Sequence, residues 1–216
     1  MRALGSARVV TISASYGAGG SVIAPAVAER LGFPFLDRAL PAAASSTAAE
    51  SADDEERTEG LITRMLSRFA SVPDPLTGGV SGVPGVPRDE VLKEQVERQV
   101  GQFARSDGVI LGWGSTVIVK RAFHVRLDGP EEARVRRGML IEGLDEGASR
   151  KRLADTDRVR SLYIRRMYGR DWRDFELYHL VVDSTSLDLD ACVSVIADTA
   201  RAFWDYTGRP ANGPLP

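Results

Sequence analysis

Cysteine is nearly absent from the sequence, since Cys192 is the single one among 216 residues. An intramolecular disulfide is therefore excluded, and the chain is compatible with a reducing compartment. The sequence also lacks any apolar run close to the roughly 20 residues that a membrane-spanning helix requires. Residues 1–10 contain no long apolar stretch of the kind found in signal peptides. We therefore expect a cytoplasmic protein with no membrane partner.

Neither sign of charge is in excess. The 28 lysines and arginines nearly balance the 30 aspartates and glutamates, which leaves a formal net charge of −2. This balance gives no indication of a nucleic-acid partner. Histidine is scarce as well, and His124 and His179 with one cysteine are too few for a typical zinc site. Cys192 falls on the apolar face of the last predicted helix, so we expect it to pack in the core.

Short apolar runs alternate with helical patterns along most of the chain. Strands are predicted at residues 9–12, 33–36, 109–111, 123–127 and 180–183, with helices between them. Parallel strands connected by helices form a sheet that helices cover on both faces. A chain of this length suits one domain with a sizeable core. The sequence therefore predicts a single three-layer α/β domain, residues 1–216, with a five-stranded parallel sheet.

Residues 41–106 interrupt this alternation. Residues 41–54 are rich in alanine and serine and then acidic, so they offer little to bury. Residues 61–69 and 88–106 have the apolar spacing of helices, and the segment between them, residues 72–87, is crowded with proline and glycine. We predict that residues 41–106 form an insertion with helices of its own.

A glycine-rich turn, residues 16–20, joins the first predicted strand to the first helix. The backbone N–H groups of such a turn and the dipole of the following helix favour phosphate. The full P-loop pattern requires Gly, four residues, and then Gly-Lys-Ser/Thr. With Gly19 as the second glycine, Ala14 takes the place of the first. Gly20 then takes the place of the lysine, and Ser21 that of the hydroxyl that binds magnesium.

Two other interpretations of this turn stay open. In a dinucleotide-binding turn, Gly17 and Gly19 would fit, although Val22 replaces the third small residue. Asp37, near the end of the second strand, stands where a ribose-binding acid would lie. The turn could also be a tight connection that binds nothing. The turn alone does not choose among the three interpretations.

Residues 150–173 contain eight arginines and one lysine against three aspartates. Cationic side chains brought over a transferring phosphoryl group stabilise the charge of the transition state. Arginine suits this role because its planar guanidinium binds two phosphate oxygens. We predict an arginine-rich lid here, and a solvated amphipathic helix is the alternative. A dehydrogenase has no obvious use for such a segment, so the turn and the arginines together favour a kinase.

Three segments, in this order, resemble the cytidylate kinase-like family of P-loop proteins. They are VVTISASYGAGGSVIAPAVAERLGFPFLDR (residues 9–38), GVILGWGSTVIVKRAFHVRLDGPEEARVRR (108–137) and DTDRVRSLYIRRMYGRDWRDFELYHLVVDSTSLDLDACVSVI (155–196). The resemblance does not extend to residues 41–106. It implies ATP-dependent phosphorylation of a nucleoside monophosphate, with CMP or dCMP as the default acceptor and Mg²⁺ required.

The resemblance assigns the donor nucleotide to two places. The donor phosphates would be cradled by Gly17, Ala18, Gly19, Gly20 and Ser21. The Ser21 hydroxyl would be the magnesium ligand. Ser184 and Thr185 follow the last strand, where the family places the adenine.

The acceptor nucleotide is assigned to other strand ends. Asp37 and Arg38 would face this nucleotide, and Arg134 would bind its phosphate. The family's strand usually ends in Gly-Arg, whereas here Trp113 follows Gly112. Trp113 would either stack on the acceptor base in place of the lost arginine or fill the core.

Arg158 and Arg160 resemble lid arginines, and Asp157 would orient one of them. The absence of lysine at Gly20 is shared with much of this family, in which an arginine in or beside the loop is common. Here the neighbours are Ala14 and Ser21, so that substitute is missing too. A slow or altered kinase, a nucleotide-binding module without turnover and a dinucleotide-dependent oxidoreductase stay open, and the sequence does not indicate an oligomeric state.

Overall fold

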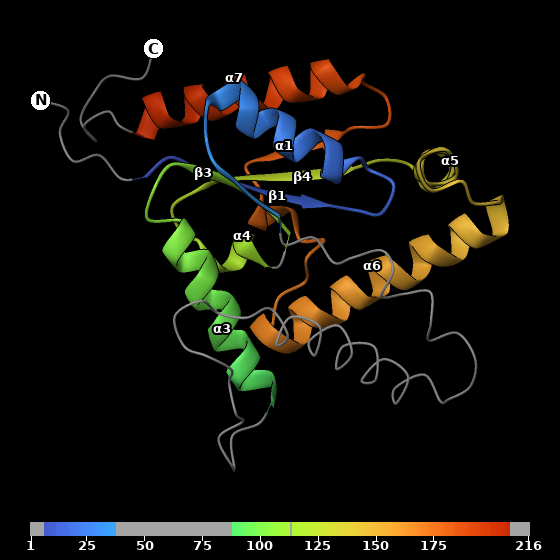
Figure 1. Cartoon of the computed structure of the whole chain (residues 1–216), viewed down its shortest axis with the longest axis horizontal. Coiled ribbons are helices and arrows are strands. Elements are labelled where there is room, and N and C mark those ends of the chain that lie inside the picture. The colour runs from blue at the N-terminus through green and yellow to red at the C-terminus, as the bar shows by residue number, and fades with distance from the viewer. Residues whose placement is uncertain (1–6, 38–87, 113, 208–216) are drawn as a thin grey trace, which may run out of the picture.

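The computed structural model describes residues 7–37, 88–112 and 114–207 (Figure 1). Its sheet has five strands in the order β2-β3-β1-β4-β5, and every neighbouring pair is parallel. The strands are β1 (Val9–Ala14), β2 (Phe35–Asp37), β3 (Gly108–Leu111), β4 (Phe123–Asp128) and β5 (Leu180–Asp183). The predicted five-stranded parallel sheet is therefore confirmed.

Helices cover both faces of this sheet. They are α1 (Gly20–Leu31), α3 (Arg88–Phe103), α4 (Ser115–Ile118), α5 (Glu131–Glu142), α6 (Glu146–Tyr168) and α7 (Leu189–Thr207), with a short 3₁₀ helix, η2 (Phe175–Leu177). Figure 1 shows α1 and α7 on one face of the sheet and α3, α4 and α6 on the other. The expected three-layer α/β architecture is confirmed.

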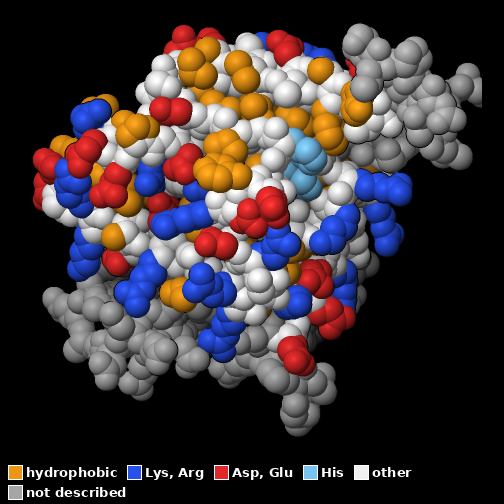
Figure 2. All heavy atoms as spheres, turned by 180° about the vertical axis from the view of Figure 1, so that it is seen from behind, with side chains coloured by type: hydrophobic (Ala, Val, Ile, Leu, Met, Phe, Trp, Pro, Cys, Tyr) orange, Lys and Arg blue, Asp and Glu red, His pale blue; other side chains and the backbone are white. Residues whose placement is uncertain are grey.

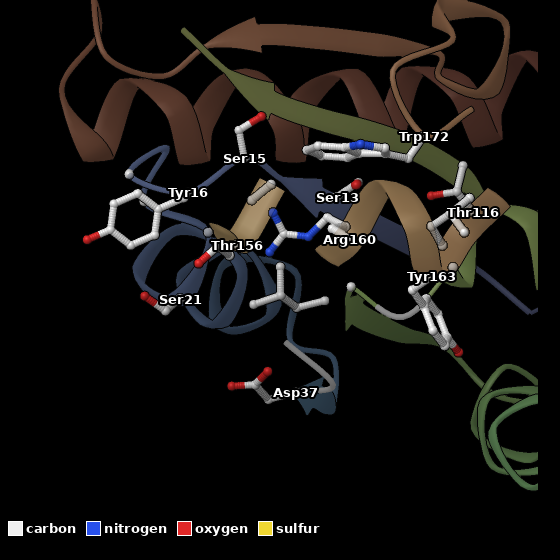
Figure 3. A pocket seen from close by; sticks show the side chains of 18 of the residues that line it. Ser13, Ser15, Tyr16, Ser21, Asp37, Thr116, Thr156, Arg160, Tyr163 and Trp172 are labelled. Carbon is white, nitrogen blue, oxygen red and sulfur yellow. The ribbon is translucent and has the colours of Figure 1, made fainter. Parts of the chain in front are cut away.

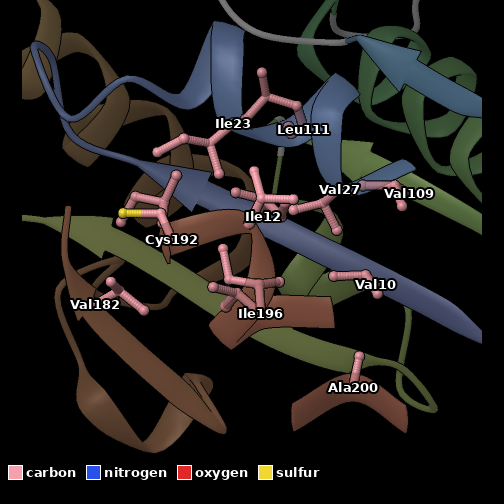
Figure 4. Close-up of a cluster of buried hydrophobic side chains, with 14 of the residues drawn as sticks. Val10, Ile12, Ile23, Val27, Val109, Leu111, Val182, Cys192, Ile196 and Ala200 are labelled. Atoms are coloured by element: carbon pink, nitrogen blue, oxygen red, sulfur yellow. The ribbon is translucent and has the colours of Figure 1, made fainter. Parts of the chain in front are cut away.

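The larger hydrophobic cluster lies between the sheet and the α1–α7 layer (Figure 4). Val10 and Ile12 of β1 contribute to it together with Ile23 of α1 and Ile196 of α7. The side chain of Val9 points to the opposite face of the sheet, where it belongs to a second cluster. A parallel strand that is buried on both faces is apolar throughout, which explains the continuous run at the start of β1.

Most of the predicted elements agree with the structure, with small shifts at their ends. The expected helix at residues 88–106 is α3, and Cys192 is buried in the core as expected. The helix expected at residues 61–69 and the loop expected at 72–87 lie outside the described residues, so the insertion remains a prediction. The arginine-rich stretch belongs largely to one long helix, α6, which begins before it and ends at Tyr168.

The surface agrees with the nearly balanced charges of the sequence. Figure 2, which shows the molecule from behind, has basic and acidic side chains mixed over the face in view. In the described residues, no helix is long and apolar enough to cross a membrane.

Candidate functional site

A pocket of about 440 Å³ lies at the edge of the sheet where the parallel strands end. Its walls come from the loop after β1, the ends of β2 and β3, and one side of α6. Ligands of open α/β sheets bind at this edge, because the loops that follow the strands converge there. The volume is in the range of small-molecule sites.

The loop after β1 brings the backbone close to the pocket. Gly17 and Gly19 have positive φ angles of 75° and 76°, a conformation that other residues rarely adopt. A Cβ atom at Gly17 would lie 2.2 Å from the carbonyl oxygen of Arg134, so only glycine fits against α5 there. Gly20 and Ser21 begin α1, where amide N–H groups have no acceptor within the helix. These amides and the helix dipole favour an anion at the pocket wall.

A buried carboxylate holds this loop against α6. Asp157 is 4% exposed, and its Oδ1 accepts a hydrogen bond from the Tyr16 amide at 2.9 Å. Arg134 donates to Asp157 Oδ2 at 2.8 Å and to the Tyr16 carbonyl at 3.1 Å. A buried charge needs a partner of opposite sign and full hydrogen bonding, and Arg134 provides both. Loop, α5 and α6 therefore meet at one ion pair.

Arg160 reaches the centre of the pocket from α6 (Figure 3). Its Nη1 lies 3.2 Å from Asp157 Oδ1, and its guanidinium carbon lies 5.2 Å from the centre of the Trp172 ring. Burial lowers the pKa of Arg160 although Asp157 acts to raise it, and arginine stays protonated in proteins in any case. Among the described residues that line the pocket, Arg160 is the only cationic side chain, whereas Asp37 and Glu142 are acidic.

A second buried arginine supports the pocket from beneath. Arg126 of β4 donates to the Trp172 carbonyl at 2.8 Å, to Ser15 Oγ at 3.2 Å and to Asp128 Oδ2 at 2.7 Å. Its guanidinium carbon lies 4.3 Å from the centre of the Trp172 ring, a cation–π distance. Burial acts to raise the pKa of Asp128, but the hydrogen bond and charge of Arg126 outweigh it and the pKa is lowered. Arg126 therefore holds Trp172 through both its backbone and its ring.

Several predicted site residues come together in this pocket. Its lining includes Gly17, Gly19, Gly20, Ser21, Asp37 and Arg160. Ala18 lies beneath the loop, where its amide donates to the Ser15 carbonyl at 3.1 Å. Arg38 and Trp113 are outside the described residues, so their assignment to the acceptor is still a prediction.

Other predicted residues lie away from the pocket. Arg134 does not line it, since its guanidinium binds Asp157 and the carbonyls of Tyr16 and Gly129. Arg158 is exposed on another side of α6.

The loop after β5 is likewise separate from the pocket. Ser184 Oγ donates to the Ala18 carbonyl at 2.7 Å, which attaches this loop to the glycine loop. Thr185 donates from its amide and its hydroxyl to Asp183 Oδ1, at 2.9 and 2.6 Å. Asp183 therefore caps the turn after β5, the commoner role of an aspartate at a strand end.

Oxygen groups in the pocket fit Mg²⁺ that arrives with a nucleotide. The Ser21 hydroxyl and the Asp37 carboxylate line the same pocket. Magnesium typically takes one or two protein oxygens and completes its shell with phosphate and water. The described residues contain no group of three or more His, Cys, Asp or Glu side chains that could hold a metal ion. The donor set thus suits a nucleotide-borne ion, and the amides of the glycine loop suit its phosphates.

Sequence reasoning missed three residues of this site: Arg126, Thr156 and Trp172. Arg126 could have been noticed, because it stands between Val125 and Leu127 in a predicted strand, and a buried arginine needs a partner. Thr156 and Trp172 line the pocket, but nothing in the local pattern separates them from ordinary core residues.

The strand order and the glycine loop before α1 are those of a P-loop kinase fold. An uncharacterized protein from Eubacterium ventriosum has a TM-score of 0.61 at 16% identity, over 90% of this chain and 98% of that chain. Shikimate kinase from Acinetobacter baumannii has a TM-score of 0.44 at 16% identity, over 94% and 96% of the two chains. Deoxyadenosine kinase from M. mycoides has a TM-score of 0.45 at 12% identity, over 90% and 99%.

These similarities to solved structures concern the fold alone. No curated protein matches the chain. The family model of the cytidylate kinase-like family matches residues 9–186, which is most of the chain. The chain therefore belongs to the cytidylate kinase-like family.

Proposed function

We propose that the protein transfers a phosphoryl group from ATP to a nucleoside monophosphate, with CMP or dCMP as the preferred acceptor. One observation carries this proposal: the glycine loop at the start of α1 and the Arg160 guanidinium line one pocket. Amide donors bind phosphate oxygens, and an arginine beside them stabilises the charge of phosphoryl transfer. Membership of the family supports the choice of a nucleotide acceptor.

The pocket residues named below then have defined tasks. The Gly19, Gly20 and Ser21 amides bind the donor phosphates, and the Ser21 hydroxyl and Asp37 hold Mg²⁺ and orient the acceptor. ATP with Mg²⁺ supplies the phosphoryl group when bound. An acceptor phosphate oxygen forms the new bond to the γ-phosphorus while the bond to the bridging β–γ oxygen breaks. Arg160 neutralises the charge on the group in transfer, and Trp172 and Tyr163 limit the access of water.

A nucleotide-binding module without turnover is the second candidate. It is favoured by Gly20 and Ala14, which leave the loop without a cation of its own. It predicts ATP binding without ADP production. A dinucleotide-dependent oxidoreductase is less well supported, because an arginine above the glycine loop suits a terminal phosphate rather than a nicotinamide.

Transfer from labelled ATP with Mg²⁺ to a panel of nucleoside monophosphates, resolved by chromatography, tests the proposal. We expect labelled diphosphate from CMP or dCMP, and a loss of about 10²–10³ in rate for Arg160→Ala, as for a lost transition-state donor. Arg165→Ala is the matched control, because Arg165 is exposed on the same helix and does not line the pocket. ATP binding without transfer to any acceptor would make the binding module the better interpretation.

A further inference from the structure

Position 20 has no room for a side chain. A Cβ atom built on Gly20 would lie 2.5 Å from the Cβ of Ala14 and 3.4 Å from Leu111 Cδ1. Two non-bonded carbon atoms do not approach each other to 2.5 Å, so either Ala14 or the loop would have to move. In the full P-loop pattern the residue at position 14 is glycine and the residue at position 20 is lysine. Ala14 and Gly20 are thus a matched pair. Here the side chain is at position 14 and the glycine at position 20, the reverse of the full pattern.

The glycine loop nevertheless faces a cation, which comes from α6. Thr156 and Arg160 are four residues apart and therefore lie on the same face of this helix. Both line the pocket, and Figure 3 shows them on the side of the loop residues Ser15, Tyr16 and Ser21. Thr156 is 9% exposed, and its Oγ1 has no hydrogen-bond partner among the described residues. A buried hydroxyl without a partner is costly unless a ligand uses it.

Asp157 fixes the distance between this cation and the loop. Its single atom Oδ1 accepts from the Tyr16 amide at 2.9 Å and lies 3.2 Å from Arg160 Nη1. The loop backbone and the guanidinium are therefore joined through one oxygen. Trp172, which is held by Arg126, lies beside the Arg160 guanidinium. Arg160 is positioned in advance, before any ligand binds.

We propose that α6 replaces the loop lysine: Arg160 supplies the charge that binds the donor triphosphate, assisted by the Thr156 hydroxyl. Ala14 and Gly20 close the place where the lysine would have been. The inference deepens the proposed function, on which it rests for the identity of the ligand as ATP.

A charge-relocation experiment tests this inference by calorimetric titration of ATP with Mg²⁺ into the full chain. We expect Arg160→Ala to weaken ATP binding at least about tenfold, the effect of one lost hydrogen-bonded charge. Adding Ala14→Gly and Gly20→Lys to that variant restores most of the affinity, because the lysine regains its place. Arg165→Ala, the control on the same helix, binds ATP as the unaltered chain does.

Two outcomes would overturn the inference. One is ATP affinity that is unchanged in Arg160→Ala, and the other is a folded triple variant that recovers none of the lost affinity. If the triple variant fails to fold, Arg160→Lys decides: retained affinity supports the role of the charge, and affinity as low as that of Arg160→Ala overturns it. Gly20→Lys alone should melt at a lower temperature than the double variant that carries both Ala14→Gly and Gly20→Lys. Equal melting temperatures would show that the two positions are not a matched pair.

The readout is binding, so it separates this inference from the proposed function. A chain that binds ATP through Arg160 but phosphorylates no acceptor would remove the proposed function and support the inference. A chain that phosphorylates CMP equally well with and without Arg160 would overturn the inference and the transition-state role given to Arg160, while the kinase activity itself would stand. If the unaltered chain does not bind ATP, both are overturned.

Discussion

Single residues of the site contact several of its parts at once. Asp157 accepts from the loop amide of Tyr16, pairs with Arg134 and contacts Arg160. Gly17 and Gly20 allow backbone and side-chain approaches that a Cβ atom would prevent.

Replacing Asp157 by Asn removes the nearer counter-charge of buried Arg134, which then keeps only Asp128 Oδ1, at 3.6 Å from its Nε. Arg134 has an 11% exposed side chain, so water cannot compensate for the lost partner. We expect the free energy of unfolding to fall by about 3 kcal/mol, the lower end of the range for breaking a buried pair. Urea unfolding measures it. Asp198→Asn, whose 73% exposed side chain pairs with Arg201 on the surface, is the control and should change stability by less than about 1 kcal/mol.

Gly20→Ala tests the crowding at position 20 without any ligand. Alanine is normally favoured over glycine in a helix by about 0.5–1 kcal/mol. Here we expect a net loss of about 1–3 kcal/mol, because the new methyl group meets Ala14. Ala14→Gly in the same chain should recover most of it.

The control for this change is Gly101→Ala in α3, where a Cβ atom would meet nothing within 4 Å. It should be neutral or stabilising by up to about 1 kcal/mol. Chemical unfolding of these three variants and of the unaltered chain measures both effects. Equal losses for Gly20→Ala with and without Ala14→Gly would contradict the assignment.

Among the elements, α6 differs most from its expected form. It is a 23-residue helix that begins with Asp145 as its N-cap, where the side chain accepts from the Ala148 amide at 2.8 Å. Leu153, Val159 and Ile164 are buried, while Arg158, Arg165 and Arg166 are exposed. The helix thus has the solvated charged face of one alternative for the arginine-rich stretch and also directs Arg160 into the pocket. The other alternative, a lid, stays a prediction.

Thr156→Val should have opposite effects on stability and on ATP use. Valine has the shape of threonine but lacks the unpartnered hydroxyl, so the melting temperature should stay equal or rise. The kcat/KM for ATP should fall by about 3- to 10-fold, which corresponds to one neutral hydrogen bond. Thr156→Ser, which keeps the hydroxyl, should retain the kcat/KM for ATP. A valine variant with unchanged kcat/KM would exclude Thr156 from the site.

For the whole molecule, the pocket and a second polar cluster, formed by Thr11, His124 and His179, lie at opposite ends of the strands. His124, near the start of β4, is 8% exposed and hydrogen-bonded to Thr11 Oγ1 at 2.7 Å. Its ring stacks on that of His179 at 5.0 Å, with 12° between the planes. The pocket lies at the other end of the strands. This separation allows fold stability to be examined apart from ligand binding.

Burial, followed by the charges of His179 and Lys120, lowers the pKa of His124 from 6.5 to about 4. Between these values the unfolded chain binds more protons, so the contribution of His124 is complete above about pH 6.5 and is lost toward pH 4. We expect stability to fall by up to about 1.4 kcal/mol per pH unit in that window. Urea unfolding from pH 7 to 4.5 measures the slope. His124→Asn should flatten it, and equal slopes would contradict the assignment.

The strands could be predicted because each is a short apolar run, and burial on both faces requires such runs in a parallel sheet. The glycine loop could be predicted because positive φ angles and close approach require glycine at defined spacings. The environment of Arg134 could not be predicted, since its partner Asp157 lies on a different helix. The same holds for Arg126, whose partners include a loop serine and the carbonyl of Trp172.

The sequence by itself determined the sheet, the glycine loop and the presence of an arginine-rich segment, because these depend on local spacing and composition. Only the tertiary structure decided which of the eight arginines between residues 150 and 173 lines the pocket. Helical periodicity places the arginines of α6 on more than one face of the helix, so spacing alone does not single out Arg160. The choice depends on contacts of Asp157 with Arg160 and with Tyr16, which is 141 residues away from Asp157. Such contacts exist only once the chain has folded, so no local pattern records them.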